Sequence, residues 1–389
     1  MTLRCQSALS RISDSAAAGR ELGTSVRAAL NGDVPDALVV FASSQHDYAQ
    51  LLEAASEASG CKIIVGSSSA GEFSDRESGT GWASALGLCS TTMVFSIGIG
   101  TNVTEDPAGA ARAVVDTFLG IKGRPLPFRS ALVMTDALAG HADRVVEELT
   151  VLTGGDYSFF GGGAGDDGKF SKTHVFAGTR ALTNALVALE IQSLKPVGIG
   201  VSHGWEPAGR PLRVTESSGA TISSLDGAPA VEAFEDHAES TGAAFNLADP
   251  APFLLHNVLG IEDDGQYRLR VPLAIMSDGS ILCAAPVPQG SIVRIMKTTA
   301  QSAVAAAEQA ALAALAAIKG STPGGALIFD CVATRLRIGK AFEDEIGACA
   351  SLLKPATFAG CNTYGQIARA EGQFGGFHNC TAVVCVFPE

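Results

Sequence analysis

The sequence predicts an α/β fold in which mixed sheets are flanked by helices and repeated units build two domains. Short apolar runs typical of buried strands alternate with amphipathic helical segments. The order strand, helix, strand, glycine-rich loop, strand occurs three times along the chain. The length of 389 residues fits two domains, which we place at residues 1–225 and 226–389.

Composition narrows the class of protein. Hydrophobic residues make up 47% of the chain, enough for a buried core, and the net charge is −13. This charge argues against proteins that coat nucleic acid or an anionic membrane. The longest apolar run, residues 310–318, is far shorter than the roughly 20 residues of a membrane helix. Without an apolar N-terminal segment or a Cys-x-x-Cys pair, we expect a cytoplasmic protein with reduced thiols and no membrane insertion.

The first unit opens with a helix over 15–30, for which Ser13 and Asp14 are the capping candidates. A strand, a second helix, a second strand and a glycine- and serine-rich loop follow, over residues 37–41, 48–59, 62–65 and 66–72. The apolar stretch from 82 to 99 is typical of two strands broken at Ser90-Thr91.

The same order recurs twice. The second unit is predicted over residues 131–134 (strand), 142–152 (helix), 157–160 (strand), 161–167 (loop), and 174–176 and 185–191 (strands). The third is predicted over residues 325–329 (strand), 342–353 (helix), 357–359 (strand), 360–365 (loop) and 380–387 (strand). We interpret the three copies as a duplication.

The segment between the second and third units differs. It is expected to hold a helix over 230–240 and a hairpin whose turn is Ser277-Asp-Gly279. The alanine-rich run from 298 to 318 predicts a long helix that ends at Gly320 and Pro323.

The three glycine-rich loops are the first candidate site. Each follows a buried strand, and ligands of open α/β sheets bind beyond the carboxyl ends of strands. Glycine also lets the backbone approach a ligand closely. The polar side chains that these loops offer are Ser67, Ser68, Ser69, Glu72, Asp166, Asp167, Asn362, Tyr364 and Gln366.

A catalytic alternative stays open. Cys361 or a loop serine could act as a nucleophile with His378 as its base, which would make the protein a hydrolase or a transferase. We expect no enzyme, because no flanking cation or helix N-terminus activates Cys361.

The seven histidines show no metal-binding spacing. A single neutral imidazole in an apolar pocket is nevertheless enough to hold a haem iron. The candidates are His203 and His378 first, then His46 and His256.

Several motifs, in order, resemble the FIST family of bacterial sensory proteins. They are Val65-Gly-Ser-Ser-Ser-Ala-Gly-Glu72, Phe160-Gly-Gly-Gly-Ala-Gly-Asp-Asp167, Gly200-Val-Ser-His-Gly-Trp205, Leu225-Asp-Gly-Ala-Pro-Ala230, Ala326-Leu-Ile-Phe-Asp-Cys331 with Arg335, Gly360-Cys-Asn-Thr-Tyr-Gly-Gln-Ile367 and Phe377-His-Asn-Cys-Thr381. They span residues 37 to 387. One departure is Cys361-Asn362, where the family often has an apolar or aromatic residue.

The resemblance implies a ligand sensor in signal transduction, with small molecules such as amino acids as ligands. It adds Arg335 and Asn379 to the ligand-binding candidates. One branch of the family binds haem, senses nitric oxide and regulates a histidine kinase. In that branch His203 or His378 would be the axial ligand of haem b, and the output would pass through a partner protein.

Overall fold

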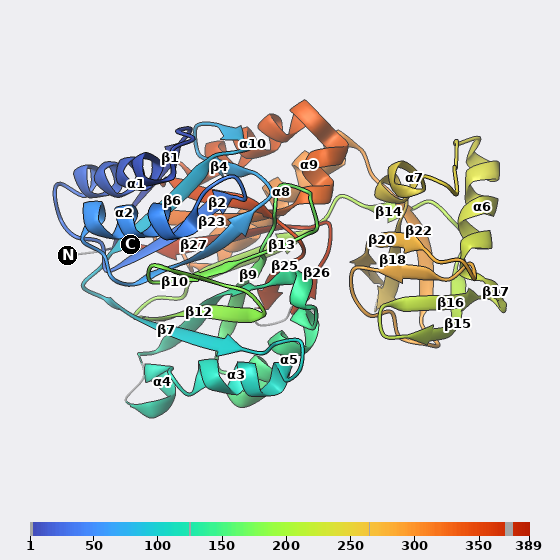
Figure 1. The fold of residues 1–389 in the computed structure, drawn as a ribbon, viewed down its shortest axis with the longest axis horizontal. Coiled ribbons are helices and arrows are strands. Elements are labelled where there is room, and N and C mark those ends of the chain that lie inside the picture. Colours follow the sequence, from blue (N-terminus) through green and yellow to red (C-terminus); the bar gives the residue numbers. More distant parts are fainter. Residues whose placement is uncertain (1–2, 124–125, 264, 370–375) are drawn as a thin grey trace.

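The computed structural model describes residues 3–123, 126–263, 265–369 and 376–389. It has two parts, a body of three units and a middle domain of residues 203–299, which lies at the right of Figure 1. The chain crosses between the two parts once on entering the middle domain and once on leaving it, so the middle domain is an insertion in the third unit.

Each unit of the body follows the order strand, helix, strand, helix and four strands, to which the second and third units add short helices, and this confirms the predicted repetition. The first unit comprises β1 Arg4–Ser10, α1 Ser15–Ala29, β2 Ala37–Ser43, α2 Tyr48–Ser59, β3 Ile64–Ser69, β4 Glu72–Ser74, β5 Ser78–Gly79 and β6 Ala83–Cys89. The second comprises β7 Met93–Thr101, α3 Pro107–Val115, α4 Leu119–Lys122, β8 Phe128–Thr135, the 3₁₀ turn Ala137–Ala139, α5 Ala142–Leu152, β9 Ser158–Gly163, β10 Val175–Ala177, β11 Arg180–Leu182 and β12 Ala185–Ser193.

The third unit is interrupted after its first strand. It comprises β13 Gly198–Ser202 and then α8 Ala300–Ala317, β23 Pro323–Cys331, α9 Val332–Ile338, the 3₁₀ turn Gly339–Ala341, α10 Phe342–Leu353, β24 Phe358–Thr363, β25 Gln366–Arg369, β26 Phe377–His378 and β27 Ala382–Pro388. The middle domain fills the gap between β13 and α8.

Each unit forms one mixed sheet and contributes a hairpin to the sheet of another unit. The three sheets have the orders β1-β6-β2-β3-β10-β11, β26-β25-β9-β8-β12-β7 and β13-β27-β23-β24-β4-β5. The hairpin β4–β5 of the first unit therefore extends the third sheet, β10–β11 of the second extends the first, and β25–β26 of the third extends the second. This cyclic exchange ties the three units into one body.

The three sheets enclose a common core and carry their helices outside (Figure 1). The inner faces meet in one cluster that includes Phe41, Phe160 and Phe329. The rings of Phe41 and Phe329, from two different sheets, lie edge to face at 5.6 Å. On the outer faces, α1 and α2 cover the first sheet, α3 and α5 the second, and α8 and α10 the third.

One glycine occupies the same place in each unit. A Cβ at Gly66 would lie 1.7 Å from the Val40 carbonyl oxygen, and one at Gly161 would lie 2.1 Å from that of Val133. At Gly360 a Cβ would lie 2.1 Å from a ring carbon of Phe73. Gly66 and Gly161 also have φ angles of 151° and 139°, which other residues rarely adopt. The predicted glycine-rich motifs therefore serve close strand packing first.

The middle domain is a nine-stranded sheet with two helices. Its elements are β14 Glu206–Pro207, β15 Leu212–Ser218, β16 Thr221–Leu225, β17 Ala228–Pro229, α6 Ala230–Thr241, α7 Ala251–His256, β18 Val258–Asp263, β19 Gln266–Arg270, β20 Pro272–Ile275, β21 Ile281–Cys283 and β22 Ile292–Lys297. A buried cluster containing Trp205 and Met296 from this part and Cys331 and Cys380 from the third unit joins it to the body.

Most predicted helices are confirmed within a residue or two, including α1 with its Asp14 cap, α2, α5, α6 and α10. One local expectation was wrong. The segments predicted as loops after β3, β9 and β24 continue as strand to Ser69, Gly163 and Thr363. The domain boundary after residue 225, which lies between the paired strands β16 and β17, stays a prediction.

Candidate functional site

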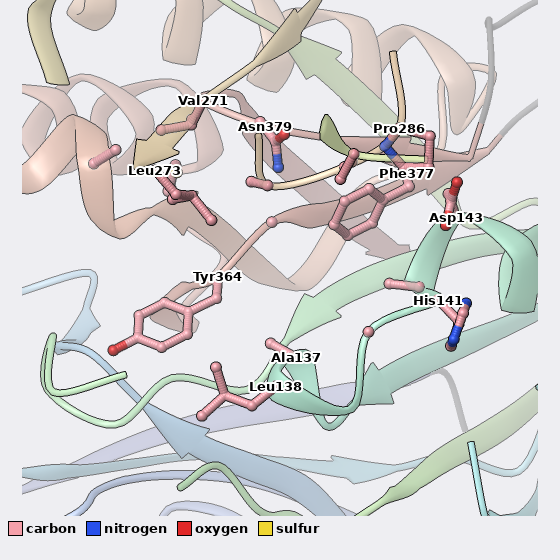
Figure 2. Close-up of a pocket in the computed structure, with 18 of the residues that line it drawn as sticks. Ala137, Leu138, His141, Asp143, Val271, Leu273, Pro286, Tyr364, Phe377 and Asn379 are labelled. Atoms are coloured by element: carbon pink, nitrogen blue, oxygen red, sulfur yellow. The ribbon is translucent and has the colours of Figure 1, made fainter. Parts of the chain in front are cut away.

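A cavity of about 420 Å³ lies between the body and the middle domain (Figure 2). Its walls come from the second unit, the third unit and the middle domain. They are formed by Ala137, Leu138, Gly140, His141, Ala142, Asp143, Phe170, Gly219, Ala220, Val271, Leu273, Ala284, Ala285, Pro286, Cys331, Val332, Ala333, Tyr364, Gly365, Phe377 and Asn379. Its size lies within the range of about 300–1,000 Å³ for small-molecule sites.

The walls are mainly apolar. Leu138 and Tyr364 form one side, and Leu273 and Val271 of the middle domain face them (Figure 2). Local structure explains these positions, because Leu138 belongs to the turn after β8 and Leu273 belongs to β20. An apolar cavity of this kind favours a ligand with an apolar body.

Asn379 supplies an unused polar group at this cavity. Its side chain is 3% exposed. Nδ2 donates a hydrogen bond to the His378 carbonyl oxygen at 3.2 Å, whereas Oδ1 has no partner among the described residues. A buried acceptor without a partner is costly, so a ligand that donates a hydrogen bond to Oδ1 would relieve that cost.

Tyr364 is held at the cavity by the second unit. Its hydroxyl donates to Asp166 Oδ1 at 2.5 Å and accepts from the Gly168 N–H at 2.9 Å. Its ring stacks on Phe170 with 4.3 Å between centroids. This arrangement fixes one wall of the cavity across two units.

Asp166 organises the loop that carries Phe170. Its carboxylate accepts hydrogen bonds from the backbone N–H groups of Phe170, Ser171 and Lys172 at 2.7–2.9 Å. Burial opposes ionisation, but the Tyr364 hydroxyl and these three donors together hold the pKa of Asp166 below its usual value. Asp166 thus positions the cavity wall, and it is not among the residues that line the cavity.

The predicted residues of the first unit lie elsewhere. Ser67, Ser68, Ser69 and Glu72 are fully buried at the end of β3 and the start of β4 and do not line the cavity. Ser69 donates to Glu72, and the Trp82 N–H donates to Glu72 Oε2 at 3.0 Å. Burial raises the pKa of Glu72 to about 8.

Two further predicted residues, Arg335 and Asn362, pair with each other, and Arg335 lines a second hollow. Arg335 Nη1 donates to Asn362 Oδ1 at 2.9 Å, and the Nδ2 of Asn362 has no partner among the described residues. Arg335 lines a second hollow of about 480 Å³, together with Asp167, Lys340 and Glu343.

Gln366, another predicted ligand-binding residue, bridges two threonine side chains of its own unit. Its Nε2 donates to the Thr363 hydroxyl at 2.9 Å, and its Oε1 accepts from the Thr381 hydroxyl at 3.1 Å. With both ends of its amide satisfied, Gln366 positions neighbouring strands. Of the eleven predicted ligand-binding residues, Tyr364 and Asn379 line the cavity.

The two histidines predicted as haem ligands do not line the cavity. His203 Nε2 lies 2.9 Å from the Tyr267 carbonyl oxygen, and its Nδ1 accepts from the Trp205 N–H at 3.3 Å. His378 Nε2 donates to the Ala368 carbonyl oxygen at 3.0 Å, and burial lowers its pKa to about 4. His46 and His256, the next candidates, are also away from the cavity.

Sequence reasoning missed His141. All seven histidines are described, and His141 is the one that lines the cavity, beside Asp143 (Figure 2). It precedes α5 with a φ of 58°. The available signal was Gly140-His141 between a buried strand and a helix, the same strand-end position that drew attention to the glycine-rich loops.

Among the described residues, the structure shows no hydrogen-bonded pair of Cys361 and His378, the nucleophile and base of the catalytic alternative. Cys361 is fully buried in the common core, where burial raises the pKa of its thiol well above its ordinary value. Within residues 3–123, 126–263, 265–369 and 376–389, no hydrogen bond joins Cys361 to His378. In the same ranges, no three His, Cys, Asp or Glu side chains are arranged to hold a metal ion.

Comparison with protein families matches the FIST N domain over residues 36–228 and the FIST C domain over residues 230–369. A comparison with curated proteins gave no significant match. No helix of the described ranges is both long enough and apolar enough to cross a membrane. FIST domains are sensory domains that act in signal transduction and bind small ligands. With both domains matched across most of its length, the chain belongs to the FIST family of sensory proteins.

Proposed function

We propose that this protein senses an apolar small molecule with a hydrogen-bond donor, which binds in the 420 Å³ cavity between the body and the middle domain. The observation that carries this proposal is the Oδ1 of Asn379, which has no partner among the described residues and lies at a mainly apolar cavity. Because the cavity walls come from both parts, a bound ligand would change the relative stability of their arrangements.

The charged lining residues narrow the ligand class. Asp143 and His141 stand at one side of the cavity, and no Lys or Arg is among the described residues that line it. A Lys or Arg side chain is the strongest partner for the carboxylate of a free amino acid. The walls therefore favour an amine or an alcohol over an amino acid, although amino acids are the ligands that the sequence resemblance implied.

Thermal denaturation with three matched probes tests this. We expect 2-phenylethylamine and 2-phenylethanol to raise the melting temperature and phenylalanine, which adds a carboxylate, to leave it unchanged. A ligand at 100 times its Kd stabilises the folded state by about 2.7 kcal/mol. Equal shifts with phenylalanine, or no shift with any probe, would overturn the assigned ligand class.

Two variants localise the binding. Leu273→Trp fills the cavity and should abolish the ligand-induced shift. Leu312→Trp on α8 is the matched control, because Leu273 and Leu312 are both 45% exposed and Leu312 does not line the cavity. Asn379→Leu removes the acceptor and should weaken binding about tenfold, the effect of one lost hydrogen bond.

Haem is a second candidate ligand, favoured by the position of His141 in an apolar cavity. Haem would supply an iron that binds nitric oxide. His203 and His378 do not fit this role, since neither lines the cavity and the Nε2 of each is engaged by a backbone carbonyl. A Soret band that shifts with nitric oxide and is lost in His141→Ala, but kept in His203→Ala, would support haem. A broad, unshifted band would exclude it.

We further propose that the ligand-bound protein regulates a partner protein. The sequence resemblance supports a histidine kinase in this role. The test is the rate of autophosphorylation of a histidine kinase with and without the protein, in the presence and absence of the ligand. An unchanged rate under all conditions would count against that partner.

A further inference from the structure

Two cysteines meet where the third unit contacts the middle domain. β23 and β27 run antiparallel with Asp330 opposite Ala382, which brings Cys331 at the end of β23 close to Cys380. Both residues are nearly buried, at 4% and 3% exposure, in one cluster with Trp205. The Cys380 thiol donates a hydrogen bond to the sulfur of Cys331.

Further donors converge on the Cys331 sulfur. The backbone N–H groups of Ala333 and Cys380 and the side chain of Gln366 point to it. The hydrogen bond from Cys380, followed by these other donors, outweighs burial and lowers the pKa of Cys331 to about 6. This shift favours the thiolate of Cys331, and the thiolate is the reactive form of cysteine.

Other buried cysteines have the opposite character. Burial raises the pKa of Cys283 to about 12 and that of Cys61 to about 11. All nine cysteines are free thiols. The electrostatic environment thus distinguishes Cys331 from the buried cysteines that only fill the core.

The cavity gives Cys331 a route to small molecules. Cys331 and its neighbours Val332 and Ala333 are lining residues, and the remaining walls are mainly apolar. An apolar route favours an organic reactant over a strongly hydrated one.

We propose that Cys331 is an oxidation site for organic hydroperoxides and that Cys380 resolves it to a disulfide. The Cys331 thiolate attacks the terminal oxygen of ROOH, so that the O–O bond breaks, Cys331 becomes a sulfenic acid and the released alkoxide takes a proton to give ROH. The Cys380 sulfur then attacks the Cys331 sulfur. The S–S bond forms, and the departing hydroxide leaves as water with the proton of Cys380.

This inference is independent of the ligand proposed above, although it uses the same cavity. A protein that oxidises at Cys331 but shows no thermal shift with the amine or alcohol probes would refute only the sensory ligand. A protein that binds a probe but leaves Cys331 reduced would refute only the oxidation site.

The test treats the full chain at pH 7 with cumene hydroperoxide or hydrogen peroxide, blocks remaining thiols with N-ethylmaleimide and maps the peptides by mass spectrometry. We expect a Cys331–Cys380 disulfide that forms faster with cumene hydroperoxide. Without oxidant, Cys331 should react with N-ethylmaleimide at least about tenfold faster than Cys283.

Variants separate the two roles. Cys331→Ser should abolish oxidation. Cys380→Ser should stop it at a sulfenic acid that dimedone traps, with Cys380→Ala as a second variant if the serine alters the melting temperature. Cys283→Ser, the buried control, should oxidise like the wild type. Slow alkylation of Cys331, a different disulfide, or equal oxidation in Cys331→Ser would overturn the proposal.

Discussion

The Tyr364 hydroxyl donates a hydrogen bond of 2.5 Å to Asp166, a residue 198 positions earlier in the chain. This contact joins the third unit to the second at the edge of the cavity. It also couples two loops, because Asp166 orders the segment carrying Phe170 and Phe170 stacks on Tyr364. The cavity wall therefore depends on pairs of units rather than on any single unit.

Tyr364→Phe should lower the free energy of unfolding by about 1.5 kcal/mol, the contribution of a hydrogen bond to a charged group. Urea denaturation measures this. A double-mutant cycle with Asp166→Asn isolates the pair, and a coupling energy of zero would show that the hydroxyl and the carboxylate do not stabilise each other.

The wild type should lose stability as pH rises, and Glu72→Gln should abolish this loss. In the folded protein burial raises the Glu72 pKa to about 8, so the buried carboxyl stays protonated while the unfolded chain ionises near its ordinary value of about 4.5. The wild type thus loses stability between about pH 4.5 and 8, by up to about 1.4 kcal/mol per pH unit. Urea midpoints of both proteins across this window measure the difference, and parallel curves would contradict the prediction.

His378→Gln should have the opposite pH signature. Burial lowers the pKa of His378 to about 4, and its Nε2 donates to the Ala368 carbonyl, a bond that the Gln amide can replace. Protonation of the unfolded chain then favours unfolding as pH falls from about 6.5 to 4. The difference in unfolding free energy between wild type and variant should change across this acid window and stay constant above pH 7. A constant difference throughout would argue against a neutral, buried imidazole.

Gly161→Ala should destabilise the body by more than about 2 kcal/mol, because the added Cβ would lie 2.1 Å from the Val133 carbonyl oxygen in a backbone with φ of 139°. Gly154→Ala is the control, since Gly154 has φ of 64° but open space around its Cβ position. In the control variant only backbone strain lowers the free energy of unfolding, by about 1 kcal/mol. Equal melting temperatures for the two variants would mean that the close approach of the strands has no energetic role.

Local signals in the sequence found most of the elements. Asp14 and Asp47 cap α1 and α2 through their side chains, and Gly60 ends α2 in the left-handed conformation. Such features depend on neighbours within a few residues, so a pattern can predict them. The helix α9 was missed, because its residues follow directly on β23 without a turn signal between them.

The candidate site was less accessible to prediction. The glycine-rich motifs predicted Ser67, Ser68 and Ser69 as ligand-binding residues. In the structure Gly66 allows a close approach of two strands, and the three serines are fully buried. The cavity draws on Leu138, Leu273 and Asn379 from three separate parts of the chain. No local pattern marks side chains that meet only after the hairpins have been exchanged between sheets.

The sequence by itself determined the α/β class, the threefold repetition and the family, because apolar periodicity, caps and motif order are properties of short segments. The tertiary structure alone decided the cyclic exchange of hairpins, the insertion of the middle domain and the cavity between them. It also decided the chemistry of individual groups. Burial raises the pKa of Glu72, and converging hydrogen bonds lower the pKa of Cys331, since both effects depend on neighbours that are distant in sequence.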